Sequence, residues 1–545
     1  VHRCVRIVSN LLQFVSIVST QLEEMLGIAT QSVKESSCSE EAMIDTFALY
    51  RNAAKNPADY AGLICNQNVV ATTVALLQCN LRKKVVASAA LAALVALTVP
   101  TDSHLQMATK EGMKTTQDVM STYEKTALDL YTNALEILDN LALNPSMTYS
   151  VLTAEVVKRA LEAVTVLRSE EKYLVVALSL ITRLQDLDGK KRFEKDLLSD
   201  RVVETCLFAL QTYSGARTIH FCCVLLLRAM QDAKRKSTIL TESTVAKLVE
   251  LLTSQREDEE VCGDLLDVLV FCAEGDKKTL LQNKDVAVPT NEIIKKYYHS
   301  QSLVEKCLSL LSMLSSLGDL NIQQILSSMT DYPSSSNVQR DALATLGCFL
   351  RANTKNAAVL LNLKGIPLCV RAVDRFFDDL AIQVNGLQVL SLLSQSDDCL
   401  SALVASTAPE VSIRSIKRFG KEESVVMSTM QLLSRCATVS SEFITNSSSL
   451  DYIIEVVLDW KEKDVILLNG CRLITLCAGD SRLGHGMIDS GVLEILTRIL
   501  TKEKQDAKLV ESSLVAIMTL TSIPAGRESM SKAALLDVFL PFYEK

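Results

Sequence analysis

Hydrophobic residues between positions 337 and 373 follow the period of a helix rather than that of a strand. Val338, Ala342, Leu343 and Leu346 lie at i, i+4, i+5 and i+8, and polar residues occupy the reverse face. This spacing predicts an amphipathic helix, because these positions fall on one side of a 3.6-residue turn.

A polar break containing Asn353 and Asn356 follows this helix, and the segment from Lys364 to Pro367 then predicts a helix end and a new start. Gly365 is expected in the left-handed position after the helix, and Pro367 fits the first turn of the next one. Three helices of this length cannot bury their apolar faces on one another alone. The segment therefore predicts similar units on either side.

The pattern of the first helix recurs along the chain, with an apolar first position, a small fifth position and apolar sixth and ninth positions. Ile382 to Leu390 matches Val338 to Leu346 closely. Copies begin at residues 42, 86, 130, 173, 218, 261, 303, 338, 382, 425, 466 and 509. Ten of the eleven steps are 41 to 45 residues long, and the step from 303 to 338 is 35 residues. A period of this length predicts a repeat protein.

Two places depart from this regularity. The 35-residue step contains the Asp331–Ser336 turn and predicts a missing or shortened first helix, with a kink near 317–337; a shorter loop is the alternative. The polar segment Thr101–Thr122 lacks a clear apolar stripe, and we interpret it as an exposed, mobile insertion within the early repeats.

Composition agrees with a helical array. At 545 residues the chain is too long for one ordinary core. Hydrophobic residues make up 48% of it, which excludes a disordered chain, and 18 Gly and 9 Pro leave room for long helices. With 64 acidic and 56 basic residues, the net charge of −8 gives no general footprint for nucleic acid.

Sixteen cysteines and five histidines do not form a metal or disulfide pattern. No C-x-x-C occurs, the histidines are scattered, and most cysteines lie in apolar helical context, as Cys348 does. We expect buried free thiols, no metal and no cofactor. Such thiols indicate a reducing, intracellular location, with the cytoplasm first and the cytoskeleton, cilium or an organelle interior as alternatives.

Neither apolar stretch near the N-terminus predicts a targeting or membrane segment. Polar residues interrupt Val5–Ile17 at helical spacing, so we expect an amphipathic first helix rather than a signal peptide, although a removed presequence stays open. Val85–Pro100 is shorter than the roughly 18 residues of a membrane span, and we expect a buried helix and no transmembrane segment.

The block VQRDALATL…N-x-x-N…K-G-I-P-L-C-V resembles the armadillo repeat, and similar second-helix segments occur at Ser243–Leu252 and Ser490–Leu496. The resemblance covers nearly the whole chain and is strongest from 337 to 520. It implies an all-α, right-handed solenoid in which one short and two longer helices form each repeat. About twelve repeats are expected, with HEAT-like repeats as the alternative.

The repeats account for the length of the chain. We expect capping helices over residues 1–30 and armadillo-like repeats over 31–330 and 331–545, in one continuous solenoid. The phosphate-binding, zinc-protease and nucleophile-elbow motifs are absent from the sequence. We therefore expect that the protein is not an enzyme.

The resemblance places binding on a groove lined by the third helices. Armadillo proteins that grip nuclear-import signals carry Trp and Asn there, at the seventh and eleventh positions of the pattern above. Here no seventh position is Trp, and the eleventh is Asn only at Asn52 and Asn140. This departure argues against an import receptor.

Arginine occupies the eleventh position at Arg183, Arg228 and Arg435, and Arg340 and Arg472 are further groove candidates. Because guanidinium groups bind carboxylates in a bidentate way, these residues and the two asparagines predict a site for an acidic or extended protein segment. The alternative is that each arginine pairs within its own stack or is solvated.

Basic clusters at Lys190, Lys191 and Arg192, at Lys234, Arg235 and Lys236, and from Arg414 to Arg418 are expected in turns between helices. They would suit tubulin tails, anionic lipid or RNA, and a solvated surface is the alternative.

The sequence thus favours a non-enzymatic scaffold that binds a partner protein along the groove or a lateral face, as a subunit of a larger assembly. A cytoskeletal or axonemal microtubule-associated protein, an accessory subunit of an organellar complex, and a regulator of a GTPase or chaperone are alternatives.

Overall fold

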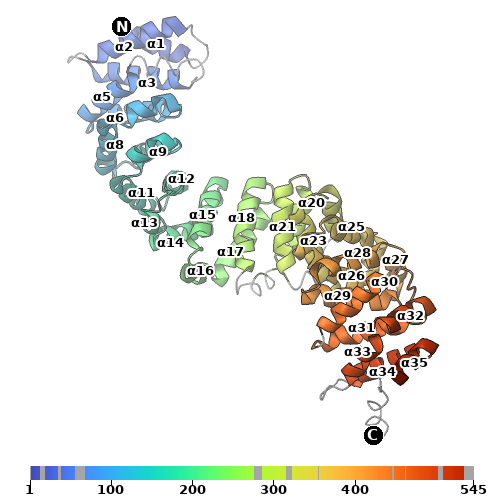
Figure 1. Ribbon diagram of the computed structural model, residues 1–545. Coiled ribbons are helices and arrows are strands. Elements are labelled where there is room, and N and C mark those ends of the chain that lie inside the picture. Colours follow the sequence, from blue (N-terminus) through green and yellow to red (C-terminus); the bar gives the residue numbers. More distant parts are fainter. Residues whose placement is uncertain are drawn as a thin grey trace. The chain divides into compact units, whose positions relative to one another are not determined.

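A computed structural model describes residues 2–532 except 13–18, 35–37, 56–67, 125, 275–280, 282–284, 315–321, 354, 445–446, 461 and 501–506. Every regular element in these residues is a helix, as the sequence predicts. The chain forms two compact units, Val1–Val268 and Leu269–Lys545. In each unit the helices are stacked in chain order (Figure 1).

All twelve segments found by the recurring pattern lie in long third helices. In unit 1 these helices are α3 (Glu40–Ala54), α6 (Lys84–Leu97), α9 (Leu128–Ala142), α12 (Glu171–Leu187), α15 (Ala216–Ala229) and α18 (Glu259–Ala273), whose end crosses into unit 2. In unit 2 they are α21 (Gln301–Met313), α23 (Ser336–Ala352), α26 (Leu380–Leu393), α29 (Glu423–Cys436), α31 (Asp464–Cys477) and α34 (Ala507–Thr521). The number of repeats, about twelve, stays a prediction.

Second helices precede the third helices, and they pack against α3, α6, α9, α12, α15 and the third helices of unit 2. They are α2 (Ser19–Lys34), α5 (Val69–Cys79), α8 (Lys110–Tyr123), α11 (Ala154–Val166), α14 (Asp200–Thr212), α17 (Glu242–Ser254), α20 (Ala287–Lys296), α22 (Ile322–Asp331), α25 (Gly365–Arg375), α28 (Ala408–Phe419), α30 (Ser447–Asp459) and α33 (Val492–Leu500).

Short helices follow the third helices, and all but the last of those in the described part of the chain lead to a second helix. They are η1 (Thr101–Ser103) with α7 (His104–Met107), η2 (Pro145–Met147) with α10 (Thr148–Val151), α13 (Glu194–Leu197), α16 (Ala233–Ile239), α24 (Asn356–Asn362), α27 (Asp397–Val404), α32 (Ser481–Asp489) and α35 (Pro524–Lys532). At the N-terminus, α1 (His2–Leu11) packs on α3.

The predicted apolar positions form the core of each stack. Val338, Ala342, Leu343 and Leu346 on α23 are all fully buried, as are the equivalent residues of α6 and α9. The small fifth position has a steric cause. At Gly470 an added Cβ would lie 2.8 Å from Cγ2 of Val457 on the second helix, so only a small residue lets the two helices approach.

The structure corrects three local expectations. Lys364, and not Gly365, takes the left-handed conformation, at φ 54°, because Gly365 begins α25 against Leu360. Thr101–Thr122 is not a mobile insertion, since it forms η1, α7 and most of α8, which buries Val119 and Met120.

The third correction concerns the basic clusters. Lys234–Lys236 lies within α16 and Arg414–Arg418 within α28, so only Lys190–Arg192 is in a turn. The shortened first helix expected before α22 falls mainly on residues 315–321, outside the described part of the chain. The cap at 1–30 and the division at 330/331 stay predictions.

Candidate functional site

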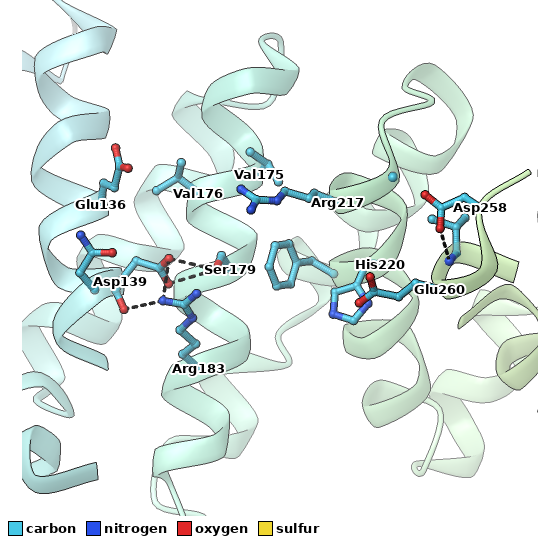
Figure 2. Close-up of a pocket in the computed structure, with 14 residues that line it drawn as sticks. Glu136, Asp139, Val175, Val176, Ser179, Arg183, Arg217, His220, Asp258 and Glu260 are labelled. Carbon is cyan, nitrogen blue, oxygen red and sulfur yellow. Dashed lines mark hydrogen bonds and ion pairs between the residues drawn. The ribbon is translucent and has the colours of Figure 1, made fainter. Parts of the chain in front are cut away.

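In unit 1 the third helices α9, α12 and α15 and the start of α18 line a groove of about 490 Å³ (Figure 2). Its position follows from helical periodicity, because each third helix buries its apolar stripe against the second helix and leaves a polar stripe on the opposite side. The ionisable side chains of the groove are Glu136, Asp139, Arg183, Arg217, His220, Asp258 and Glu260.

Asp139 is the most buried carboxylate of the groove. Ser179 donates its hydroxyl to both carboxylate oxygens, at 3.1 and 3.0 Å, and Arg183 Nη1 lies 3.0 Å from Oδ2. Burial raises the pKa of Asp139 to about 6, against the lowering effects of Arg183 and Ser179. Asp139 and Arg183 therefore pair mainly with each other, as part of the contact between neighbouring repeats.

Glu136 and Glu260 differ from Asp139, since neither forms an ion pair with any residue that the structure describes. Glu136 lies at the α9 side of the groove and Glu260 at the α18 side (Figure 2). Partial burial raises the pKa of Glu136. The two carboxylates are available to a cationic group that enters from outside.

His220 lies on α15 near the centre of the groove, and its Nδ1 is 2.7 Å from Oδ2 of Asp264 on α18. Asp258 is half-buried, and its Oδ1 accepts a hydrogen bond from the backbone N–H of Val261 over 3.1 Å. Arg217 is exposed at the rim. Four carboxylates and two guanidinium groups line the groove, so its balance is acidic.

The eleventh-position residues named from the sequence bond mainly to the preceding repeat. Asn52 donates to the carbonyl oxygen of Ser9 at 2.9 Å, and Asn140 donates to that of Val95 at 3.3 Å. Arg183 donates to the carbonyl oxygen of Asp139 at 2.8 Å.

The other two eleventh-position arginines also donate to carbonyl oxygens of the preceding repeat. Arg228 donates to the carbonyl oxygen of Thr182 at 3.3 Å and also pairs with Asp186. Arg435 donates to the carbonyl oxygen of Ser394 at 3.1 Å and pairs with Asp397. The pairing within the stack that the sequence left as an alternative is thus present at all three arginines, and their role in partner binding stays a prediction.

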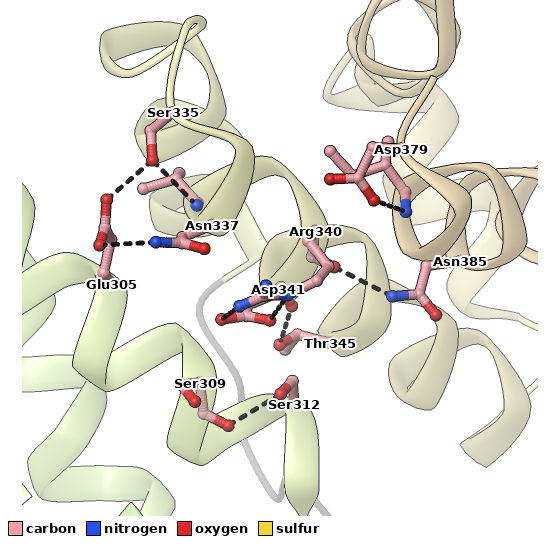
Figure 3. A network of polar contacts seen from close by, with 12 residues as sticks. Glu305, Ser309, Ser312, Ser335, Asn337, Arg340, Asp341, Thr345, Asp379 and Asn385 are labelled. Carbon is pink, nitrogen blue, oxygen red and sulfur yellow. Dashed lines mark hydrogen bonds and ion pairs between the residues drawn. The ribbon is translucent and has the colours of Figure 1, made fainter. Parts of the chain in front are cut away.

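Arg340 lies in a separate polar network in unit 2 (Figure 3). Its Nε donates to Oδ1 of the neighbouring Asp341 at 2.8 Å, and its carbonyl oxygen accepts from Asn385 at 3.3 Å. Glu305, on α21, accepts from Ser335 at 2.8 Å and from Asn337 at 3.2 Å. This network joins α21, α23 and α26.

Arg472 is exposed on α31 and forms no ion pair with the residues described. It lines a groove of about 570 Å³ together with Arg435, Glu511 and Val515. Among the residues predicted as partner contacts, it has the most accessible charge.

Most of the predicted basic clusters are exposed. Lys191 pairs with Glu194 at 3.0 Å, and Arg235 bonds to the carbonyl oxygen of Leu198. Lys190, Arg192 and Lys234 point into solvent, and Lys236 is half-buried.

Sequence reasoning missed the groove residues Asp139, His220 and Glu260, and also Asp264, the partner of His220. The available signal was the repeat register, because Glu136 and Asp139 are three residues apart on one helix face. Over the described residues, no group of three or more His, Cys, Asp or Glu is placed to hold a metal ion.

In the same part of the chain, no single helix is both long enough and apolar enough to cross a membrane. Three bent helix pairs reach that length and apolar character only when their two helices are taken together.

Comparison with known proteins identifies the fold. The family model described as the LRRK2 ARM repeat matches residues 262–534, which is half of the chain. None of the curated proteins matches the chain significantly.

Among solved structures, one described as "A conserved phosphorylation switch controls the interaction between cadherin and beta-catenin in vitro and in vivo" is similar, with a TM-score of 0.63 and 12% identity. The alignment covers 91% of this chain and 98% of that chain, and at this identity it shows the fold alone. Two engineered proteins are 18% identical over 51% of this chain, covering 99% and 96% of theirs, but their TM-scores of 0.30 and 0.32 carry no argument.

Proposed function

This chain belongs to the armadillo-repeat family, and we propose that it is a scaffold that holds an extended segment of a partner protein in the groove of α9, α12, α15 and α18. Armadillo solenoids commonly bind proteins in this way. A non-catalytic role and a reducing intracellular location are parts of the same proposal.

The observation that carries this proposal is the difference between the paired and unpaired charges of the groove. Arg183 is bonded to Asp139, whereas Glu136 and Glu260 have no cationic partner in the described structure. A segment with Lys or Arg near both ends would supply the missing cations. The proposal therefore favours a basic segment here, in contrast to the acidic segment that the arginines suggested.

The length of the segment follows from helix spacing. Packed helices lie about 8–10 Å apart, so the three steps from α9 to α18 span about 27 Å. An extended chain rises about 3.3 Å per residue, so about eight or nine residues would reach from Glu136 to Glu260. Arg217, between these ends, would favour a neutral or acidic residue at the centre.

The test is the binding of a labelled peptide of this length, with lysine at both ends and polar neutral residues between, measured by fluorescence anisotropy on the full chain. We expect Glu136→Gln and Glu260→Gln each to weaken binding about tenfold, and added salt to weaken it further. Glu111→Gln, an exposed change on α8 outside the groove, is the control. Equal binding by all variants, or preference for an acidic peptide, would contradict the proposal.

A second candidate site is favoured by Arg472. Its exposed guanidinium beside Arg435 would receive a carboxylate-rich segment, which is the partner expected from the sequence. Binding of an acidic peptide that Arg472→Gln weakens, and that Glu136→Gln leaves unchanged, would support this site. The cytoskeletal, organellar and regulatory roles stay predictions.

A further inference from the structure

Two consecutive turns of unit 1 expose large apolar side chains at matching positions. Val99 and Leu143 precede the short helices η1 and η2, and Leu105 and Tyr149 are the second residues of α7 and α10. The exposed fractions are 60% and 56% for the first pair and 73% and 92% for the second. We call these four residues the apolar edge.

The two turns correspond in structure as well as in sequence. η1 and η2 have the same length, as do α7 and α10, and each element begins 44 residues after its counterpart. Each short helix is also anchored by buried residues, His104 and Met107 in α7 and Val151 in α10. This burial fixes the orientation of each helix, so Leu105 and Tyr149 are held outward by the fold.

The corresponding turns of the next two repeats are basic. The first carries Lys190, Lys191 and Arg192, followed by Lys195 on α13, and the second carries Lys234 on α16. We call these five exposed residues the basic edge. Because α9, α12 and α15 pack side by side, their following turns continue the same side of the stack as the apolar edge.

Two acidic side chains in these turns accept hydrogen bonds from backbone N–H groups. Asp188 accepts hydrogen bonds from the N–H groups of Arg192, at 2.9 Å, and Phe193, at 2.6 Å. Asp232 accepts from the N–H of Lys234 at 2.9 Å. These two carboxylates are directed toward the chain, and Lys190, Arg192, Lys195 and Lys234 extend into solvent, whereas Lys191 pairs with Glu194. Glu194 and Asp196 on α13 remain as acidic neighbours, and the excess of exposed basic residues over them leaves this edge positive.

We propose that unit 1 docks on an anionic membrane surface, with the apolar edge inserted at the level of the lipid headgroups and the basic edge against their negative charge. Tyr and aliphatic tips favour this interfacial position, and exposed lysines and arginines add attraction to anionic lipid. A protein partner fits less well, because the four apolar residues are divided between two turns one repeat apart and form two small groups.

The experiment is co-sedimentation of the full chain with vesicles of phosphatidylcholine and phosphatidylserine in equal parts, against vesicles of phosphatidylcholine alone. We expect binding that depends on phosphatidylserine and decreases with salt. The double change Leu105→Ser with Tyr149→Ser should weaken it about tenfold. Replacing Lys190, Lys191 and Arg192 by Gln should weaken it about a hundredfold.

Val439→Ser, at an exposed apolar position in unit 2, is the matched control and should bind as the wild type does. Unchanged circular dichroism and thermal midpoints would show that the edge variants fold, and unchanged binding of the groove peptide would separate this surface from the groove. Absence of vesicle binding by the wild type, or wild-type binding by the Leu105/Tyr149 variant, would overturn the proposal. Self-association without vesicle binding, lost in that variant, would assign the edge to a second copy and also overturn it.

Discussion

Arg183 on α12 reaches back one repeat to Asp139 on α9 and bonds to both its backbone and its side chain. Nη1 of Arg183 donates to the carbonyl oxygen of Asp139 at 2.8 Å and lies 3.0 Å from carboxylate oxygen Oδ2. The carbonyl belongs to the last turn of α9, where the helix supplies no donor. One guanidinium therefore satisfies an unbonded helix end and a buried charge together.

Arg183→Ala should loosen α9 and α12 locally. The change leaves the buried Asp139 carboxylate without its cation, and we expect a loss of about 2 kcal/mol in local stability. Hydrogen exchange followed by mass spectrometry should show faster exchange in peptides from these two helices. Arg472→Ala, at an exposed position without an ion pair, should leave exchange unchanged, and equal effects of the two changes would contradict this account.

Asp139 should make stability depend on pH. Burial raises its pKa from 3.8 to about 6, so the folded state holds this proton more tightly than the unfolded state. Its stabilising contribution is then complete below pH 3.8 and is lost as the pH rises through about 6.

Asp139→Asn should remove this part of the pH dependence. Thermal midpoints of the wild type and the variant, compared across the acid and neutral range, should diverge by an amount equivalent to about 3 kcal/mol. Glu111→Gln should follow the wild type. Parallel pH profiles for the wild type and Asp139→Asn would show that Asp139 titrates normally.

Gly386 should not tolerate a side chain, although it lies within a helix. A Cβ there would collide with Val373 on the second helix and lie 3.4 Å from Leu343. We expect Gly386→Ala to lower the free energy of unfolding by about 1–3 kcal/mol, because the packed helices must separate.

Gly347→Ala is the matched change, since nothing lies closer than 3.7 Å to an added Cβ. Ala should be neutral or raise stability by about 0.5–1 kcal/mol in this helix interior. Denaturant unfolding of both variants measures the difference, and a similar loss in each would rule out the steric explanation.

The described cysteines should separate into two classes of reactivity. Cys4 and Cys79 are exposed and should be alkylated quickly in the native chain. Burial raises the pKa of Cys369, Cys436 and Cys477 to about 12, so these thiols should react only after unfolding. Peptide mass spectrometry after brief iodoacetamide treatment would distinguish them, and rapid native labelling of Cys436 would contradict the burial.

Repeat architecture was predictable from the chain alone. The spacing of Val338, Ala342, Leu343 and Leu346 predicts a buried helix face, and every other copy of that spacing falls in a third helix. The free, mostly buried thiols were predictable for the same reason, since cysteines in apolar helical context occupy core positions. These features depend on residues within a few turns of one another, which is the range that periodicity reports.

The roles of the charged residues were decided by tertiary structure. Arg183, Arg228 and Arg435 occupy one position of the repeat, but the backbone carbonyl oxygens that accept their hydrogen bonds lie 41 to 46 residues earlier in the chain. Likewise, the polar stretch from Thr101 was predicted to be a mobile insertion, whereas in the structure α8 packs its few apolar residues into the stack. Local spacing specifies which face of a helix is buried, whereas the partner of a polar side chain depends on how neighbouring repeats stack. That stacking brings together residues one repeat apart, and it decided which charges of the groove are paired and which remain open to a partner.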